Sequence, residues 1–596
     1  MPGNFFLKLR SNIELDQDIE LAEREAKALF GQVRRVQDYS SPTAEVPVPT
    51  TLLTANSRQQ APVGFIASQP KYDLNLIAAS PAFIQEIWFL VADRSKTGLK
   101  DSPFWEARQV PGGYAICVLP LMAAGELLSC TKNGLPNSQL LHRFTQVLSD
   151  TSAVGDGHML ASLTRRGTSN PHVHGLHKYK AKSFPRMVRS LIVSCLETLP
   201  KNLDGEITVM DPFVGSGTTL IEASLLGLPS IGIDIDRLSC HISNAKIDLL
   251  TGINPQELRD AVSETITRTG ELFQTAANHD RYSFPPWITR KFERWHSQIE
   301  QVELETEITK WLGAINEVAN SAIRRVLEVC LSDAIGRKFN IRMMGTGVGR
   351  FALEIAKTRL STLMESNLNR LLHTAFTCAT LISAYDGRLG KAKVLNDTAT
   401  SMPLPNESVS LILTSPPYLP ASSGRENYLI SKSVSITALG LMSGKEIQAK
   451  EKQSVGSMKS IGTLDWKGVP NEVHRLYEWL KNDSLREIKA VPTVLYYRDI
   501  KKALGESFRV LVPGGIAIYI IGKESVFYRF STRKVLYRVS CDDIFREIAE
   551  SCGFIVEESI DVELAKKNRN ARPRSLDSYY ETVVQLRKPV SGRSVK

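Results

Sequence analysis

The chain has 596 residues, of which 42% are hydrophobic and 23% are charged, and its formal net charge is +10. This length exceeds what one hydrophobic core supports, so two to four domains are expected, and the modest positive charge suits a polyanionic partner without requiring one. The sequence has neither a secretory signal nor an apolar run of about 18 residues, which predicts a cytoplasmic protein that does not span a membrane. The eight cysteines include no Cys-x-x-Cys pair, so reduced thiols are expected and a zinc cluster is not.

Residues 1–150 are predicted to form a separate α+β domain. Residues 4–9 form an apolar run typical of a strand, and residues 16–30 have the pattern of a helix, with Gly31 just past its end. A further strand is expected at residues 112–119. We regard this domain as a candidate for substrate recognition.

A ligand-binding turn is predicted in the next domain segment, residues 165–250. The stretch Asp211-Pro-Phe-Val-Gly-Ser-Gly-Thr-Thr follows a short apolar strand and opens an apolar helix pattern. Because glycine permits a positive φ and lets backbone N–H groups approach a ligand at a helix N-terminus, Gly215 and Gly217 indicate such a turn. A second strand, residues 230–234, ends at Asp234, about twenty residues past the glycines, the spacing of an acid that binds a ribose diol.

Three histidines, His172, His174 and His177, precede this unit. The sequence offers no cysteine or acid at a suitable spacing to complete a metal site with them. We therefore predict a basic loop beside the ligand site, and no metal ion.

An insertion of about 140 residues, 251–390, follows the second strand. Apolar residues recur at three- and four-residue spacing over residues 300–318 and 321–334, which predicts helices. The basic, glycine-rich stretch 337–350 is predicted to be a loop. The insertion either touches a polynucleotide or packs as a helical cap over the ligand site, and the sequence favours neither.

Residues 391–590 are predicted to complete the sheet. Strands are expected at residues 394–397, at 408–414 and, as a final edge strand, at 581–588, with a helix and a fifth strand within 496–522. Residues 421–480 are polar and rich in Ser and Gly, which predicts a mobile loop.

The strand at residues 408–414 ends in Ser415-Pro-Pro-Tyr418. Neither proline can donate to a ladder, so the chain leaves the sheet in a stiff corner. Such a corner suits a planar base that bears an amino group. The Ser415 hydroxyl and the Pro416 carbonyl can accept its two N–H bonds, while Tyr418 stacks on the ring.

Together, the glycine-turn motif and Thr-Ser-Pro-Pro-Tyr resemble those of the S-adenosylmethionine-dependent DNA amino-methyltransferases, which methylate cytosine N4 or adenine N6. The resemblance covers residues 170–250 and 390–590 and implies an α/β fold with a doubly wound, mostly parallel Rossmann-like sheet. It implies a catalytic corner of Ser415, Pro416, Pro417 and Tyr418. The residues that it implies for S-adenosylmethionine binding lie in the glycine turn, at strand ends and before the turn: Asp211, Pro212, Phe213, Gly215, Gly217, Thr218, Asp234, Asp397, His177, Tyr179, Phe184 and Pro185.

The reaction implied by the resemblance is direct displacement of the methyl group by the amine, without a covalent enzyme intermediate. In that family Ser at the first motif position goes more often with cytosine N4, and Asp or Asn with adenine N6. Site-specific methylation of cytosine N4 in double-stranded DNA is therefore favoured, and adenine N6 is the alternative. A cognate restriction endonuclease is a further partner to be considered.

A second resemblance keeps an RNA substrate open. Residues 5–30 are similar to the small ferredoxin-like domain that precedes the methylase domain of certain tRNA guanine-N2 methyltransferases, whereas Ser415 and the large insertion count against that activity. A binding module with a degenerate methylase core predicts a broken glycine turn or a lost proline pair, and both are intact. The basic stretches 532–538 and 566–574 suit phosphate contacts.

Overall fold

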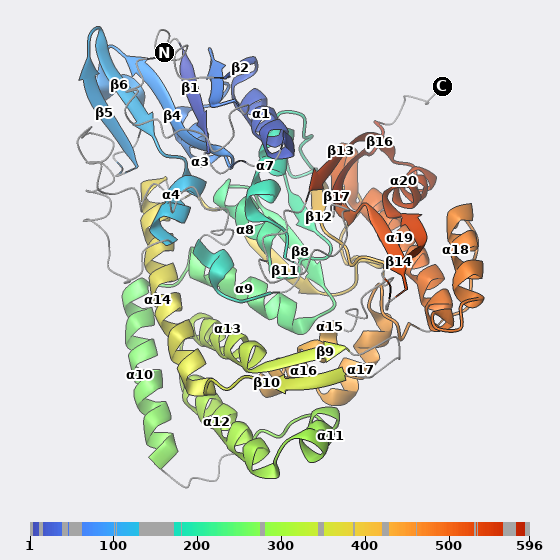
Figure 1. Ribbon diagram of the computed structural model, residues 1–596. Helices are drawn as coiled ribbons and strands as arrows, with labels where there is room; N and C mark the ends of the chain where they lie inside the picture. Colours follow the sequence, from blue (N-terminus) through green and yellow to red (C-terminus); the bar gives the residue numbers. More distant parts are fainter. Residues whose placement is uncertain are drawn as a thin grey trace.

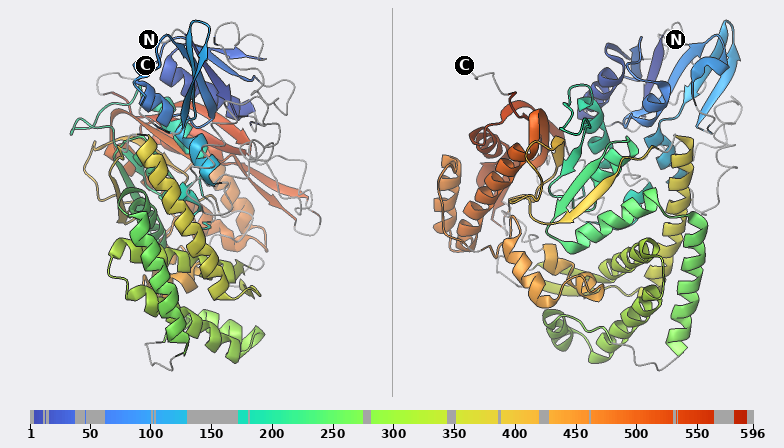
Figure 2. Two further views of the ribbon diagram at one scale, coloured as in Figure 1. Left: turned by 90° about the vertical axis from the view of Figure 1, so that its left-hand side faces the viewer. Right: turned by 180° about the vertical axis from the view of Figure 1, so that it is seen from behind.

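The structure is a computed structural model. It describes residues 4–10, 13, 16–37, 46, 62–99, 102, 104–129, 172–179, 182–274, 281–343, 351–385, 388–419, 428–460, 462–529, 532, 534–563 and 580–590. An N-terminal sheet lies at one end of the molecule, a second sheet occupies the middle, and a group of helices forms the opposite end (Figure 1). The two turned views in Figure 2 show the same order from the side and from behind.

The N-terminal sheet has six antiparallel strands in the order β2-β3-β1-β4-β6-β5. Its elements are β1 (Phe5–Leu9), α1 (Asp16–Phe30), β2 (Val33–Val36), β3 (Gly64–Ala67), α3 (Leu74–Ala79), β4 (Ile84–Val91), β5 (Trp105–Val110), β6 (Gly113–Val118) and α4 (Leu121–Ser129). The strands predicted at residues 4–9 and 112–119 and the helix predicted at 16–30 are confirmed. This sheet is joined to the rest of the protein through a shared core, because α1 packs on α7 (Pro185–Cys195).

The central sheet has seven strands in the order β11-β8-β7-β12-β13-β17-β16. Its strands are β7 (Val209–Asp211), β8 (Ser230–Asp234), β11 (Ala392–Asn396), β12 (Val409–Thr414), β13 (Leu511–Gly522), β16 (Ile555–Glu563) and β17 (Tyr580–Arg587). The first five strands in this order are parallel, and β17 runs antiparallel to both of its neighbours. The α/β, doubly wound, mostly parallel sheet expected from the sequence is confirmed.

Both faces of this sheet are covered. On one face Leu411, Leu413 and Ile518 pack with α7 and α1. On the other face Ile412 and Tyr519 pack with α18 (Asn471–Lys481), α19 (Ala490–Val510) and α20 (Cys541–Ser551). The chain order reverses between β7 and β12, where ligands of such sheets bind outside the carboxyl ends of the strands.

The prediction of β17 as an edge strand is wrong, because β16 pairs with it on the outer side. The sequence of β16, Ile-Val-Glu-Glu-Ser-Ile-Asp-Val-Glu, is rich in acids and gave no signal of a strand in this sheet. The position of β17 between β13 and β16 places its first residues beside the end of β13, close to the carboxyl edge of the sheet.

The insertion is helical, as predicted, and consists of α10 (Pro255–Gln274), α11 (Pro286–Trp295), α12 (Gln298–Asn316), α13 (Ser321–Lys338), β9 (Phe339–Met343), β10 (Phe351–Ile355) and α14 (Leu360–Ala384). The loop predicted at residues 337–350 is wrong for the part that the structure describes, since α13 ends at Lys338 and β9 pairs with β10. Phe339 and Ile341 are buried in the insertion core, and this burial favours a strand over a loop. The same core includes α8 (Thr218–Leu225) and α9 (Arg237–Thr251), so the insertion packs directly on the helices beside the glycine turn.

The mobile loop predicted at residues 421–480 is also corrected. Residues 428–460 and 462–481 form α15 (Tyr428–Ser431), α16 (Ser433–Ala438), α17 (Gly444–Gln453) and α18. Ile436 and Ile447 are fully buried in the insertion core, which holds α16 and α17 in place. Residues 421–427, and the basic stretch 566–574, lie outside the described residues. Within the described part of the chain, no helix combines the length and apolar character that crossing a membrane requires.

Candidate active site

A buried carboxylate joins the two motifs at the carboxyl edge of the sheet. Asp211 ends β7, and its Oδ1 accepts hydrogen bonds from the Thr414 hydroxyl (2.6 Å) and the Phe213 amide (3.0 Å). Its Oδ2 accepts from Thr219 of α8 at 2.8 Å. Burial raises the pKa of Asp211 to about 6, although these three hydrogen bonds lower it. Since Thr414 precedes Ser415 and Thr219 follows the glycine turn, one side chain holds the corner against the turn.

The glycine turn adopts the conformation that its sequence predicts. Gly215 and Gly217 have φ values of 50° and 79°, which residues with a Cβ rarely adopt. A Cβ at Gly217 would lie 2.9 Å from the Ser243 hydroxyl oxygen. Ser243 of α9 also donates to the Gly215 carbonyl at 3.1 Å, so the turn is closely packed against that helix.

An acidic strand end lies beside the turn. Asp234 accepts a hydrogen bond from the Gly215 amide (2.9 Å) and another from the Asp236 amide (2.9 Å). Burial, together with the negative charge of the neighbouring Asp236, raises the pKa of Asp234 to about 6. Asp397 lies one strand away, where its backbone amide donates to the Asp234 carbonyl at 3.2 Å. The structure thus brings Asp211, Asp234 and Asp397 to adjacent strand ends, as the parallel topology predicts.

Tyr179 lies over the turn, where its ring would be 3.4 Å from a Cβ at Gly215. Its hydroxyl is 2.8 Å from the Ser239 hydroxyl and 3.1 Å from Lys432 Nζ. Lys432 in turn pairs with Asp236 at 2.6 Å. Burial lowers the pKa of Lys432, but the negative charges of Asp236 and Asp234 outweigh that effect and raise it overall. This contact links the segment after the Ser-Pro-Pro-Tyr corner to the glycine turn, and sequence reasoning did not find it.

The other residues predicted before the turn are not brought to it by the contacts of the described residues. His177 Nε2 lies 3.1 Å from the Ser332 hydroxyl of α13, and burial lowers the pKa of His177 to about 4. Phe184 is the N-cap of α7 and packs against the core that α7 shares with α1, and Pro185 is the buried first residue of that helix. Of this segment, Tyr179 contacts the turn directly.

The corner itself is held in place by two tyrosines. The Tyr496 hydroxyl donates to the Pro417 carbonyl at 3.0 Å. This hydrogen bond does not involve the neighbouring Pro416 carbonyl, which is the predicted acceptor for the amino group. Tyr418 is 37% exposed, and one side of its ring covers Gly522, where a Cβ would lie 3.7 Å from it. A cavity of about 50 Å³ lies beyond, lined by Tyr418, Tyr496 and Phe545 among others, and that volume suits a few water molecules.

The Tyr418 hydroxyl has two polar neighbours. It donates to Glu581 Oε1 at 2.6 Å and lies 3.4 Å from the Ser415 hydroxyl. Burial raises the pKa of Tyr418 well above its ordinary value, and the nearby Glu581 raises it further. Glu581 is near the start of β17 and lies 163 residues from Tyr418 in the sequence. No local pattern indicated it, because its place depends on the pairing of β17 with β13.

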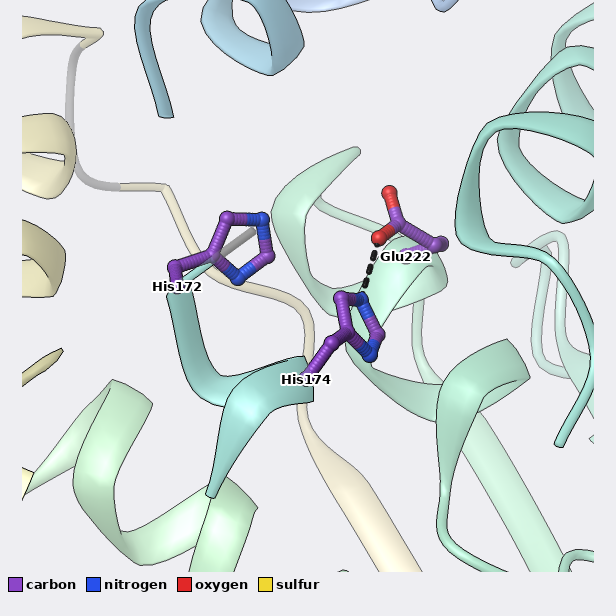
Figure 3. A group of neighbouring side chains, drawn as sticks. All are labelled: His172, His174 and Glu222. Atoms are coloured by element: carbon purple, nitrogen blue, oxygen red, sulfur yellow. Dashed lines mark hydrogen bonds and ion pairs between the residues drawn. The ribbon is translucent and has the colours of Figure 1, made fainter. Parts of the chain in front are cut away.

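Two of the three histidines, His172 and His174, form a buried cluster rather than the predicted basic loop (Figure 3). His172 and His174 belong to η4 (His172–Gly175), and Glu222 of α8 completes a group whose ligand atoms lie within 4.8 Å of one another. His174 Nε2 is 2.6 Å from Glu222 Oε1, and Arg189 donates to Oε2 at 2.7 Å. Burial lowers the pKa of His172 to about 3 and that of His174 well below its usual value, so both are neutral near pH 7.

The prediction that no acid would meet these histidines is therefore wrong, since the fold supplies Glu222. The geometry alone is compatible with a metal ion. However, Arg189 and Lys246 place positive charge beside the cluster and lower the pKa of His174, and the same field opposes a bound cation. We interpret the cluster as a buried hydrogen-bonded link between η4, α7 and α8.

Comparison with known proteins identifies relatives of this chain. A family model described as DNA methylase matches residues 88–245, which include the glycine turn and exclude the corner. The Type II methyltransferase M.MjaII of Methanocaldococcus jannaschii is 28% identical over 139 residues, 23% of this chain and 24% of that protein. The Type II methyltransferase M.MvaI of Kocuria varians is 22% identical over 375 residues, 59% of this chain and 77% of that protein.

The chain therefore spans about a quarter of the length of one curated relative and about three quarters of the other. A solved structure titled a SAM-dependent methyltransferase, from Methanosarcina mazei, aligns with 66% of this chain and 97% of its own, at 8% identity and a TM-score of 0.23.

Proposed function

We propose that this chain, which is related to the S-adenosylmethionine-dependent DNA amino-methyltransferases, methylates the N4 amino group of cytosine at specific sites in DNA. The observation that carries the proposal is the Asp211 carboxylate, which binds Thr414 beside the corner and Thr219 beside the turn. A cofactor in the turn and a base at the corner would therefore be neighbours, as direct methyl transfer requires.

The residues around the turn fit S-adenosylmethionine. The turn opens α8, where backbone N–H groups accommodate polar ligands. The buried Ser216 hydroxyl of the turn has no hydrogen-bond partner among the described residues, so it is available to a polar ligand. Asp234 and Asp397 would hold the polar ribose and adenine groups at the strand ends, and Tyr179 would cover the methionine end.

At the corner, the protein would orient the amine and stabilise charge. When bound, S-adenosylmethionine supplies an electrophilic methyl carbon. The Ser415 hydroxyl and the Pro416 carbonyl would accept the two amino N–H bonds, which favours a nitrogen lone pair directed at that carbon and stabilises the positive charge that develops on nitrogen. The exposed part of the Tyr418 ring would stack on a base taken out of the duplex.

Cytosine N4 is favoured over adenine N6 by Ser415, because the related enzymes with Ser at this position more often modify cytosine. Adenine N6 is the second candidate, since one hydroxyl acceptor serves either amine. The names of the curated relatives also suggest a restriction–modification context with a cognate endonuclease.

The proposal is tested with purified protein, labelled S-adenosylmethionine and mixed-sequence duplex DNA. Wild type is expected to label the DNA, and digestion to nucleosides is expected to yield N4-methylcytosine. Ser415→Ala and Tyr418→Ala are each expected to reduce labelling at least 100-fold while calorimetric cofactor affinity stays within about twofold. Undiminished turnover in both variants would refute the assignment of the corner.

A further inference from the structure

A hydrogen-bond chain leads from the reactive corner to a carboxylate on another strand. The Ser415 hydroxyl lies 3.4 Å from the Tyr418 hydroxyl, and that hydroxyl donates to Glu581 Oε1 at 2.6 Å. All three residues lie in the part of the chain that the structure describes. These hydrogen bonds therefore connect Ser415, the predicted acceptor for the amine, to Glu581, an acid that belongs to no sequence motif.

The direction of these hydrogen bonds follows from Glu581. An ionised carboxylate only accepts, so Tyr418 must donate to it. The Tyr418 oxygen is then free to accept from Ser415, which orients the Ser415 proton toward Tyr418. The lone pairs of Ser415 are left for the amino group of the substrate.

Methyl transfer to an amine creates a proton that must leave. As the N–CH₃ bond forms and the S–CH₃ bond breaks, the nitrogen becomes positively charged and retains both of its hydrogens. A serine hydroxyl is too weak a base to keep one of them. A nearby carboxylate within hydrogen-bond reach can take it.

We propose that Glu581 receives the proton released by the methylated amine, through Ser415 and Tyr418. The amine N–H proton moves to Ser415 Oγ, the Ser415 proton moves to Tyr418, and the Tyr418 proton moves to Glu581, which becomes neutral. Serine and tyrosine end as they began, and the half-buried Glu581 then loses its proton to solvent. This inference rests on the proposed methyl transfer. Because Glu581 acts through Tyr418, it is a positioning residue that also stores the proton.

The surroundings of Glu581 leave it available for this role. Burial raises its pKa above the ordinary 4.5, while the bond from Tyr418 lowers it. Nearby charges on the adjoining strands are already paired: Lys523 after β13 with Asp561 of β16, and Glu524 with Arg538. Among the described groups, Tyr418 faces Glu581 most directly, and Tyr496 lies behind Tyr418. Another acid of raised pKa, Glu451, has no hydrogen bond to the corner.

The test compares single-turnover methyl transfer in wild type, Glu581→Gln, Tyr418→Phe and the double variant. Gln keeps an oxygen that accepts from Tyr418 but cannot take a proton, and Phe keeps the ring. Each single variant is expected to slow transfer about 100-fold. The double variant is expected to be no slower than either single variant, because each substitution interrupts the same proton path. Glu557→Gln, on the neighbouring strand β16, is the matched control and is expected to match wild type.

The pH profile adds a readout that a structural role would not change. Wild type is expected to lose rate as the pH falls through the pKa of Glu581, above 4.5, because the protonated acid cannot accept; Glu581→Gln is expected to lack that limb, and Glu581→Asp to restore it in part.

A Glu581→Gln rate within twofold of wild type with the same pH profile would overturn the relay and leave the methyltransferase proposal intact. Additive losses in the double variant would also overturn the relay. A wild type that binds cofactor and never methylates DNA would instead overturn the proposed function.

Discussion

At the residue scale, Asp211 has a role that its motif position did not reveal. The sequence predicted a cofactor ligand, whereas both carboxylate oxygens accept hydrogen bonds from the protein itself. Its partners Thr219 and Thr414 lie on different elements, so its effect is to fix the distance between them. A side chain of this kind stabilises the fold and the site together.

We expect Asp211→Asn to lower the free energy of unfolding by about 1–3 kcal/mol. One carboxylate oxygen would be replaced by an NH₂ group, so a buried donor that now bonds to that oxygen would lose its acceptor. Methyl transfer is expected to fall at the same time as the corner loses its register with the turn. Chemical denaturation measures the first effect and a turnover assay the second. Asp204→Asn, on an exposed turn before β7, is the control, and equal stability of the two variants would contradict this role.

Residues of the site differ in how far sequence could predict them. The positive φ of Gly215 and Gly217 was predicted because it follows from local backbone chemistry, whereas the role of Ser415 stays a prediction. Glu581 and Lys432 were not predicted, because each reaches the site through tertiary packing. The contact of His177 with Ser332 of the insertion was not predicted either, because no local pattern links the two residues.

At the element scale, the turn before α8 is the feature that sequence predicted best. Strand, glycines and helix are contiguous, so their geometry depends little on the rest of the chain. The order of β16 and β17 could not be predicted in the same way. Alternating side chains fit an edge strand and a strand next to the edge equally well. The position of β17 depends on whether another strand, here β16, pairs with its outer side.

Gly217→Val tests the turn. We expect it to abolish calorimetric binding of S-adenosylmethionine, because the new side chain strains a φ of 79° and meets Ser243. Gly205→Val is the matched control, since Gly205 has a φ of 78° but nothing within 4 Å of its Cβ position. If both variants bind cofactor equally well, the ligand does not occupy this turn.

At the scale of the whole molecule, the insertion supports the domain that carries the glycine turn. The helices of the insertion share a core with α8 and α9. Of the two predictions for the insertion, packing as a helical cap is therefore favoured for the helix faces that lie in this core. The sequence predicted its helices but not this packing, because periodicity shows which face is apolar and not what covers it. Contact of its outer faces with nucleic acid stays a prediction.

A shared core predicts joint unfolding. Leu327→Ala, at a fully buried position of α13, is expected to cost about 2–5 kcal/mol and to shift loss of helix and loss of cofactor binding together. Circular dichroism and cofactor binding are followed along one denaturant series. Leu485→Ala, at a residue that is 65% exposed, should change neither transition. Separate midpoints in the Leu327 variant would show that the insertion folds independently.

The most direct test of the account is mass spectrometry of nucleosides from cells that express the wild-type chain or Ser415→Ala. The proposed activity predicts N4-methylcytosine in the DNA of cells with wild type and its absence with the variant. N6-methyladenine in its place would correct the base while keeping the amine chemistry. A new N2-methylguanosine in tRNA, with no change in DNA, would contradict the account.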